Sequence, residues 1–425
     1  MVAGAGSGKT RVLVHRIAWL IEVENISPHS ILAVTFTNKA AAELRARTES
    51  LLNMSTRSMW VGTFHSLAHR LLRMHWAEAK LPQNFQILDS DDQVRLIKRI
   101  MRTQDIDEKK WPARQAAWFI NGQKDEGRRA HEVADADDLF QITHKKIYQA
   151  YEETCDQGGL VDFAELLLRS HELWLNDPSL LQHYQQRFSH LLVDEFQDTN
   201  AIQYAWLRVL AGRQSNIMAV GDDDQSIYGW RGAKIENIHN FTAHFPQVNT
   251  IRLEQNYRST KNILDAANGL IQQNADRLGK ELWSAGGEGE PIKVYAGFND
   301  LDEARFIVER IEQWLETGGS ADEVAVLYRS NAQSRVIEEA LLRANIAYQI
   351  YGGQRFFERA EIKNALAYMR LIEDRHSDPA FERVVNTPPR GIGDKSIESI
   401  RQLARQRQQS MWTAAKAGIS EGLFA

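Results

Sequence analysis

Cysteine, long apolar runs and net positive charge are all scarce in this sequence. The single cysteine among 425 residues, Cys155, excludes an internal disulfide framework and favours a reducing compartment. No apolar run reaches the roughly 20 residues of a membrane-spanning helix, so we expect a cytoplasmic protein without a membrane partner. The formal net charge is −5, and any binding of nucleic acid must therefore depend on local clusters.

A glycine-rich stretch stands at the start of the chain, Ala3-Gly4-Ala5-Gly6-Ser7-Gly8-Lys9-Thr10. It fits the phosphate-binding loop (P-loop) pattern, with Ala3 at a position that is usually glycine. An amphipathic helix follows, so bound phosphates would lie at a helix N-terminus. We expect Lys9 to reach the β- and γ-phosphates of a nucleotide and Thr10 to offer its hydroxyl to Mg²⁺. Only Met1-Val2 precede the loop, and we therefore expect its strand to be incomplete.

Two later β-rich runs end in polar residues that suit phosphoryl transfer. Residues 190–195 predict a buried strand that delivers Asp194 and Glu195 to its carboxyl edge, where open α/β sheets bind ligands. Asp194 is expected to hold Mg²⁺ opposite Thr10, and Glu195 to position and deprotonate the attacking water. Gln225 follows the next strand and is expected to sense the γ-phosphate. The alternative is a pair of exposed acids at a strand end.

Aromatic side chains and arginine come directly after Gln225. Tyr228, Trp230 and Arg231 lie among glycines and form a candidate platform on which bases would stack. Spacing alone leaves Trp230 equally suited to the platform and to the protein core. Further along, Tyr257 is a candidate for stacking on adenine, and Arg258 for contacting the γ-phosphate.

Three other features carry weaker signals. His65 and His69 are four residues apart but lack the glutamate of a zinc-protease helix, so we interpret them as helix-surface or DNA-near residues. The turn Gly391-Ile392-Gly393 precedes a helix and suits a duplex phosphate, or equally an ordinary helix-hairpin turn. One helix has an apolar face of Val94, Ile97 and Met101. Its basic face consists of Arg95, Lys98, Arg99 and Arg102. This face is either exposed to solvent or contacts successive phosphates of a nucleic-acid backbone.

Strands and helices alternate at both ends of a long helical stretch, which predicts an α/β fold with parallel sheets. We interpret residues 64–188 as a helical insertion in the first α/β domain. A second α/β set follows a linker-like patch, with strands expected at 292–296, 324–328 and 348–351 and helices at 302–317 and 332–344. The remainder is expected to be helical.

Six motifs, in this order and spacing, resemble those of the superfamily 1 DNA helicases of the UvrD/Rep/PcrA group. They are Ala3–Thr10, Thr35–Leu44, Gly62–His65, Val193–Thr199, Val220–Ala233 and Gln255–Ser259. The resemblance extends over essentially the whole chain.

This resemblance implies an ATP-dependent motor with 3′→5′ polarity on single-stranded DNA, acting in nucleotide excision and mismatch repair. ATP and Mg²⁺ are the implied cofactors. Single-stranded DNA, single/double-strand junctions and DNA-repair proteins are the implied partners, in the bacterial cytoplasm. The implied fold is two RecA-like P-loop domains, each interrupted by a mainly helical insertion. The boundaries are then 1–63 and 189–254 for the first core, 64–188 for its insertion, 255–351 for the first part of the second core and 352–425 for the second insertion, which we expect to be incomplete.

The resemblance also assigns residues to the DNA path. Phe36, Tyr228 and Trp230 would form the pockets through which bases step. Arg11 and Arg258 would contact the γ-phosphate. The remaining positions expected at DNA are Thr35, His65, Arg231, Arg329, Gly391 and Gly393.

The chain also departs from the family pattern. The adenine-binding motif that the family carries before the P-loop is absent, as are the later motifs with a second arginine for the γ-phosphate. The alternative interpretation is therefore a truncated, catalytically deficient nucleic-acid-binding fragment. The helicase-nuclease branch of the superfamily would need a nuclease domain, which this sequence does not show.

Overall fold

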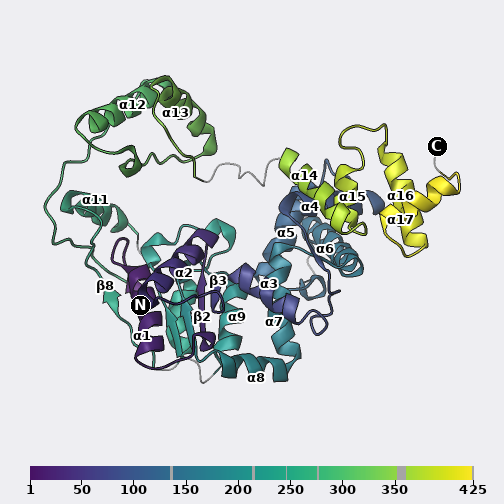
Figure 1. The fold of residues 1–425 in the computed structure, drawn as a ribbon, viewed down its shortest axis with the longest axis horizontal. Coiled ribbons are helices and arrows are strands. Elements are labelled where there is room, and N and C mark those ends of the chain that lie inside the picture. The colour runs from purple at the N-terminus through teal and green to yellow at the C-terminus, as the bar shows by residue number, and fades with distance from the viewer. Residues whose placement is uncertain (135–136, 213–215, 246, 275–276, 352–359, 424–425) are drawn as a thin grey trace. The chain divides into compact units, whose positions relative to one another are not determined.

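The structure is a computed structural model, and it describes residues 1–425 except 135–136, 213–215, 246, 275–276, 352–359 and 424–425 (Figure 1). The chain divides into two compact units, Met1–Ile292 and Lys293–Ala425, and each is described by itself. The fold is mixed α/β with parallel sheets, as predicted. Among the described residues, no helix combines the length and apolar character that crossing a bilayer requires.

A four-stranded parallel sheet forms the centre of the first unit, in the order β3-β2-β6-β7. Its strands are β2 (Ile31–Thr35), β3 (Trp60–Thr63), β6 (His190–Val193) and β7 (Asn216–Ala219). Beyond β7, the short strand β1 (Val2–Ala3) pairs in parallel with β8 (Arg252–Leu253). The Ala3 N–H donates to the Gly221 carbonyl at 2.9 Å. The chain thus enters the P-loop from the short strand β1, which lies beside Gly221, two residues after the end of β7.

Alternate residues of β2 enter two different cores, as expected of a sheet covered on both faces. Ile31 and Ala33 pack with the helices α1 (Lys9–Glu22) and α2 (Asn38–Leu52). Leu32 and Val34 pack with residues of α3 (Phe64–Met74), α7 (Phe163–Asn176) and α9 (Ala201–Ala211) on the other face. The unit also contains α10 (Glu236–His244) and α11 (Lys261–Ile271).

Most of residues 64–188 is helical, as the sequence predicts. α4 (Ser90–Thr103), α5 (Ala113–Asp125) and α6 (Leu139–Gly158) share a core of their own, while α8 (Pro178–Arg187) and α7 contribute to the core on the sheet. Two short strands, β4 (Gln86–Ile87) and β5 (Leu160–Val161), pair in parallel. Ile97 and Met101 of α4 are fully buried, so the predicted apolar face is confirmed.

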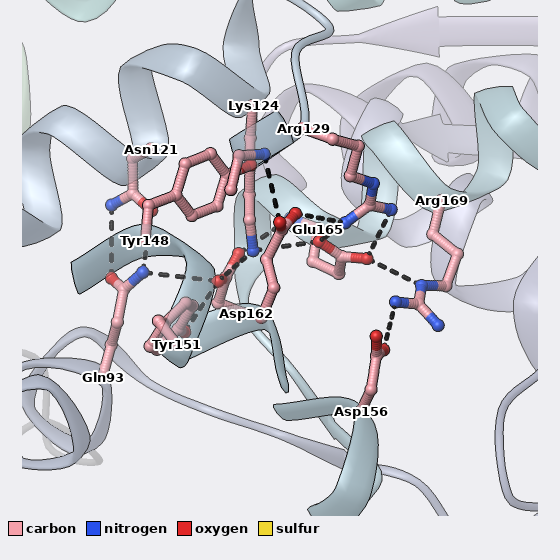
Figure 2. A network of polar contacts seen from close by, with 12 residues as sticks. Gln93, Asn121, Lys124, Arg129, Tyr148, Tyr151, Asp156, Asp162, Glu165 and Arg169 are labelled. Carbon is pink, nitrogen blue, oxygen red and sulfur yellow. Dashed lines mark hydrogen bonds and ion pairs between the residues drawn. The ribbon is translucent and has the colours of Figure 1, made fainter. Parts of the chain in front are cut away.

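A buried ionic network joins α5 to α7 (Figure 2). Lys124 Nζ lies 2.7 Å from Asp162 Oδ2 and 2.9 Å from Glu165 Oε2. The Arg129 guanidinium donates two hydrogen bonds to Glu165, at 2.8 and 2.9 Å. Burial alone would raise the pKa of Glu165, but Lys124 and Arg129 hold that pKa well below its usual value. The cations therefore compensate the buried carboxylates, and the network fixes the helices to one another.

The second unit is mainly helical among its described residues. α12 (Asp300–Glu316) packs on α13 (Asn331–Arg343), and both helices were predicted. A second cluster joins α14 (Ala360–Glu373), α15 (Asp378–Val384), α16 (Asp394–Gln406) and α17 (Met411–Ser420).

The three strands predicted for residues 292–296, 324–328 and 348–351 are wrong in this structure, because none of these described segments is assigned as a strand. A strand is stabilised by hydrogen bonds to neighbouring strands and by burial of its apolar side chains. Here the side chains of Val294 and Leu327 are 93% and 94% exposed. The local sequence favours extended chain in these segments, and Val324 and Val326 are partly buried against α12 and α13, but no segment has a neighbouring strand among the described residues.

The buried network makes a testable contribution to stability. Lys124→Met leaves Asp162 and Glu165 with less positive charge to balance them, and breaking a buried pair in this way usually costs about 3–5 kcal/mol. We expect a loss of this size in the free energy of unfolding, measured by urea titration. The control is Glu43→Gln, which removes an ion pair to Arg47 whose side chains are about half exposed, and should change stability by less than about 0.5 kcal/mol. Equal losses in the two variants would contradict a structural role for the network.

Candidate functional site

The P-loop lies between β1 and α1, and its conformation depends on glycine at two positions. Gly6 and Gly8 have φ of 67° and 91°, in the left-handed region that other residues rarely adopt. Gly8 caps α1, and Lys9 and Thr10 are the first two residues of that helix. The loop therefore ends at a helix N-terminus, the arrangement that favours a bound phosphate.

The chain around Asn256 fastens the P-loop from one side. Asn256 Nδ2 donates to the Ala5 carbonyl at 2.6 Å, and the Tyr257 N–H donates to the Gly6 carbonyl at 3.0 Å. A Cβ on Gly6 would lie 2.6 Å from Asn256 Nδ2 and 2.8 Å from the Arg258 Cβ, so no side chain fits there. Arg258 is thereby held next to the loop. Sequence reasoning did not single out Asn256, although it lies within the recognised motif Gln255–Ser259.

Lys9 faces the carboxyl edge of β6 and β7. Its Nζ lies 4.0 Å from Glu195 Oε2 and 3.8 Å from Asp222 Oδ2, and it also approaches the Ala3 carbonyl at 3.4 Å. These carboxylates come from two neighbouring strands that end at the same edge of the sheet. The structure thus brings Lys9 and Glu195 together as the sequence predicts, and adds Asp222.

The two acids that follow β6 lie in different environments. Asp194 is buried, and its N–H donates to the Val34 carbonyl at 2.8 Å. Burial, and next the charge of Glu195, raise the pKa of Asp194 to about 6. Glu195 is more exposed and has φ of 49°, an uncommon conformation that a non-glycine residue adopts at a cost. Its Oε2 accepts a hydrogen bond from Gln197 Nε2 at 2.9 Å.

The residues expected to hold Mg²⁺ fit such an ion chemically. Asp194 and the half-buried Thr10 supply oxygen ligands, which Mg²⁺ prefers. Burial and the charge of Glu195 also raise the pKa of nearby Asp198 to about 6, and its buried Oδ1 has no hydrogen-bond partner among the described residues. Lys9 only partly offsets the repulsion among the carboxylates of Asp194, Glu195 and Asp198. A bound cation would reduce this repulsion further.

A second acidic group, Asp222 to Asp224, is already paired. Their ligand atoms lie within 4.8 Å of one another, but Lys280 Nζ is 2.6 to 2.8 Å from all three carboxylates. Burial works against the charge of Lys280, and its hydrogen bonds to the three aspartates nevertheless raise its pKa. Gln225 Nε2 donates to Asp222 Oδ2, so the predicted γ-phosphate sensor contacts the carboxylate oxygen that lies 3.8 Å from Lys9 Nζ. Sequence reasoning missed Lys280, since no local pattern links it to residues more than 50 positions earlier.

The aromatic segment after Gln225 is displayed to solvent. Trp230 is 76% exposed, so the alternative that places it in the core is wrong. The Arg231 guanidinium lies 4.6 Å from the Trp230 ring centre and 5.1 Å from that of Tyr228. An arginine held over two aromatic rings beside open solvent is a surface on which a nucleic-acid base can stack.

Comparison with known proteins now identifies the family. Residues 1–246 match the family described as UvrD/REP helicase N-terminal domain, and residues 251–413 match the UvrD-like helicase C-terminal domain. The chain belongs to the UvrD-like helicases. It is 63% identical over 425 residues to DNA helicase II of Escherichia coli and 60% identical over 429 residues to DNA helicase II of Haemophilus influenzae; each alignment covers all of this chain and 59% of the relative.

A more distant relative, the ATP-dependent DNA helicase PcrA of Staphylococcus epidermidis, is 42% identical over 415 residues, covering 97% of this chain and 57% of that protein. The chain thus spans less than two thirds of the length of these UvrD-like helicases.

The other expected DNA contacts in the first unit lie in varied settings. Thr35 is buried, and its Oγ1 has no hydrogen-bond partner among the described residues. Phe36 is partly buried against the main core. The His65 ring lies 6.2 Å from the Phe163 ring, edge to face, and burial lowers its pKa. Arg11 and Tyr257 are exposed near the P-loop.

In the second unit, the Gly-Ile-Gly turn lies at a helix start, as expected. Gly391 has φ of 74°, and Gly393 caps α16 without a side-chain hydrogen bond. Arg329 is exposed, and its N–H donates to Gln333 Oε1 at 2.9 Å. Each residue is accessible for a phosphate contact.

The basic face of α4 is engaged within the protein. Arg95 pairs with Asp92 at 2.9 Å and Lys98 with Glu108 at 2.6 Å. This geometry favours the solvated face over the phosphate-following one.

A junction missed by sequence reasoning connects the insertion to the chain that follows Glu195. Asn200 Nδ2 donates to Asp125 Oδ1, at the end of α5, at 2.9 Å. Burial raises the pKa of Asp125 to about 7, and the charges of Asp162 and Glu126 add to this rise.

Asp125→Asn should therefore stabilise the protein in a pH-dependent way. The folded state disfavours ionised Asp125, so the wild type should lose stability relative to the variant as pH rises from about 4 to about 7, and no more above that. At pH 8 we expect the variant to be more stable by over about 1 kcal/mol, because one pKa unit corresponds to about 1.4 kcal/mol. Urea unfolding of both proteins across pH 4–8 measures this. A difference that does not change with pH would contradict the raised pKa.

Proposed function

We propose that this chain is the ATP-hydrolysing and DNA-binding part of a 3′→5′ DNA helicase that unwinds duplex DNA in nucleotide excision and mismatch repair. The observation that carries the proposal is the position of Lys9. It projects from a P-loop to within 4.0 Å of Glu195 and 3.8 Å of Asp222, at the edge of a parallel sheet. The names of the relatives, DNA helicase II and ATP-dependent DNA helicase PcrA, support the same function.

In this proposal, the loop from Ala3 to Gly8 and the ammonium of Lys9 bind the nucleotide phosphates. Thr10 and Asp194 hold Mg²⁺, which neutralises charge on the phosphate oxygens. Glu195 accepts the proton of the attacking water. The hydrogen bond from Gln197 orients the Glu195 carboxylate for this step. Gln225, Arg11 and Arg258 contact the γ-phosphate, and Tyr257 stacks on the adenine.

Single-stranded DNA is the proposed partner of the aromatic platform. Bases would stack on Trp230 and Tyr228, with Arg231 adding positive charge. Thr35, Phe36 and His65 would contact single-stranded DNA as well. In the second unit, Arg329 would contact single-stranded DNA and the Gly391–Gly393 turn would contact duplex DNA. Single/double-strand junctions and DNA-repair proteins are the further partners proposed, in the bacterial cytoplasm. The polarity, the repair roles and the domain boundaries given above rest on the resemblance to the family.

Phosphate release tests this function directly. The purified chain is assayed with ATP and Mg²⁺, with and without a single-stranded oligonucleotide. Hydrolysis that rises with DNA supports a motor. DNA binding without stimulated hydrolysis would favour the alternative of a catalytically deficient nucleic-acid-binding protein.

Glu195→Gln should abolish most hydrolysis while leaving ATP binding near normal. The amide cannot accept the proton of water, and loss of a general base usually slows catalysis by about 10²–10⁴-fold. Single-turnover hydrolysis and equilibrium ATP binding measure the two effects separately. Glu236→Gln, an exposed position at the start of α10, is the control and should change neither. Near-normal turnover of Glu195→Gln would assign the base elsewhere.

Trp230→Ala should weaken single-strand binding by about 1–3 kcal/mol, the usual contribution of one stacked base. The weakening should depend little on base sequence, because every base offers a π-face. Trp118→Ala is a matched control, since Trp118 is 72% exposed on α5 and lies outside the platform. Fluorescence anisotropy with labelled oligonucleotides measures both variants. An equal loss for the two tryptophans would refute the platform.

A further inference from the structure

We propose that Lys280 is a positioning residue of the nucleotide site, whose ammonium group keeps the carboxylates of Asp222, Asp223 and Asp224 from capturing Lys9 or a second metal ion. This inference rests on the proposed binding of ATP at the P-loop. Lys280 has no role in the motifs that identify the family, and it lies beyond α11, at a distance along the chain from every other residue assigned to the site.

The contacts of Lys280 are unusually complete. Its Nζ lies 2.6 Å from Asp222 Oδ1, 2.6 Å from Asp223 Oδ1 and 2.8 Å from Asp224 Oδ2. Its side chain is 1% exposed. An ammonium group has three donors, and here each of them meets a carboxylate.

Arg277 adds a second positive charge beside the three aspartates. It binds Asp224 through two hydrogen bonds, at 2.7 and 2.8 Å, and the Leu278 N–H donates to Asp223 Oδ2 at 2.8 Å. The segment 277–280 therefore acts as a cationic clip on the loop that follows β7.

Asp222 connects this clip to the P-loop because its two oxygens have different partners. Oδ1 binds Lys280, whereas Oδ2 accepts from Gln225 and lies 3.8 Å from Lys9 Nζ. A charged hydrogen bond between lysine and carboxylate is normally about 2.7–2.9 Å long, so Asp222 is near Lys9 without holding it. If the ammonium of Lys280 were removed, Lys9 would be the cation best placed to take over Asp222.

The same three carboxylates would otherwise suit a divalent cation. Their ligand atoms lie within 4.8 Å of one another, and hard oxygen ligands of this kind bind Mg²⁺ and Mn²⁺. Lys280 places its own charge where the three carboxylates converge. It thereby leaves Thr10 and Asp194 as the oxygen ligands at the phosphates.

The experiment compares Lys280→Met with the wild type in two assays on the full chain. Binding of Mn²⁺ is measured first by electron paramagnetic resonance without nucleotide, and the variant should bind about one ion more than the wild type. Affinity for a fluorescent ATP analogue is measured next at low Mg²⁺. It should fall by about 10- to 100-fold, the range for losing one charged hydrogen bond to the phosphates, and recover as Mg²⁺ fills the aspartates and releases Lys9.

Two further variants separate positioning from general stability. Lys280→Arg keeps the charge and should gain no Mn²⁺ site. Lys261→Met makes the same substitution at an exposed lysine at the start of α11 and should behave as the wild type in both assays.

The double variant Lys280→Met/Asp222→Asn removes the carboxylate that would capture Lys9, and should regain nucleotide affinity. The double variant has one buried carboxylate fewer than Lys280→Met. It can therefore be tested for nucleotide binding even if Lys280→Met does not fold. No added Mn²⁺ in the single variant, or no recovery in the double variant, would overturn the proposal. If the wild type itself fails to bind the analogue, the proposed nucleotide site is wrong, whereas the Mn²⁺ assay still decides what Lys280 does.

Discussion

The parallel pairing of β6 with both β2 and β7 is the constraint on which the site depends. Parallel strands end at the same edge, so the residues that follow them meet there although they are far apart in sequence. Thr35 ends β2, Asp194 and Glu195 follow β6, and Asp222 follows β7. The Ala3 hydrogen bond to Gly221 then places the P-loop at that same edge. A one-residue change of register in β6 would exchange the side chains that face the two cores and separate Asp194 from Lys9.

Two groups of buried acids in the first unit show how a structural ionic network differs from a binding site. In the network of Figure 2, Lys124 and Arg129 more than offset the burial of Glu165, and its pKa is well below the usual value. At the sheet edge, Lys9 does not offset the burial of Asp194 and Asp198, and their pKa values rise to about 6. In the first group the cations balance the buried carboxylates. In the second group the negative charge is balanced only in part, so a further cation would be bound favourably. Perturbed acids of this kind commonly mark functional sites.

Sequence reasoning succeeded where the signal is local and failed where the partner is distant. The P-loop, the buried strands and the acids after β6 each follow from neighbouring residues, because period and turn chemistry are properties of short segments. Asn256 and Lys280 were missed, since their partners lie 251 and 57 residues away, respectively. Trp230 could not be assigned, as core and platform favour the same residue type. The failed strands at 292–296 and 324–328 show the converse, because their pattern is local but a strand also needs a neighbour.

The segment Thr199–Asn200 shows how the two halves of the candidate site are physically joined. It follows Glu195 by a single short helix, η3 (Phe196–Asp198), and its Thr199 carbonyl accepts hydrogen bonds from the Lys234 N–H and from Asn237 Nδ2, both at 2.9 Å. Lys234 is only four residues beyond Trp230. Asn200 meanwhile binds Asp125 of the insertion. A displacement of the loop that carries Glu195 would therefore have to be shared by the aromatic segment and by α5, or break buried hydrogen bonds at a cost of about 1–3 kcal/mol each.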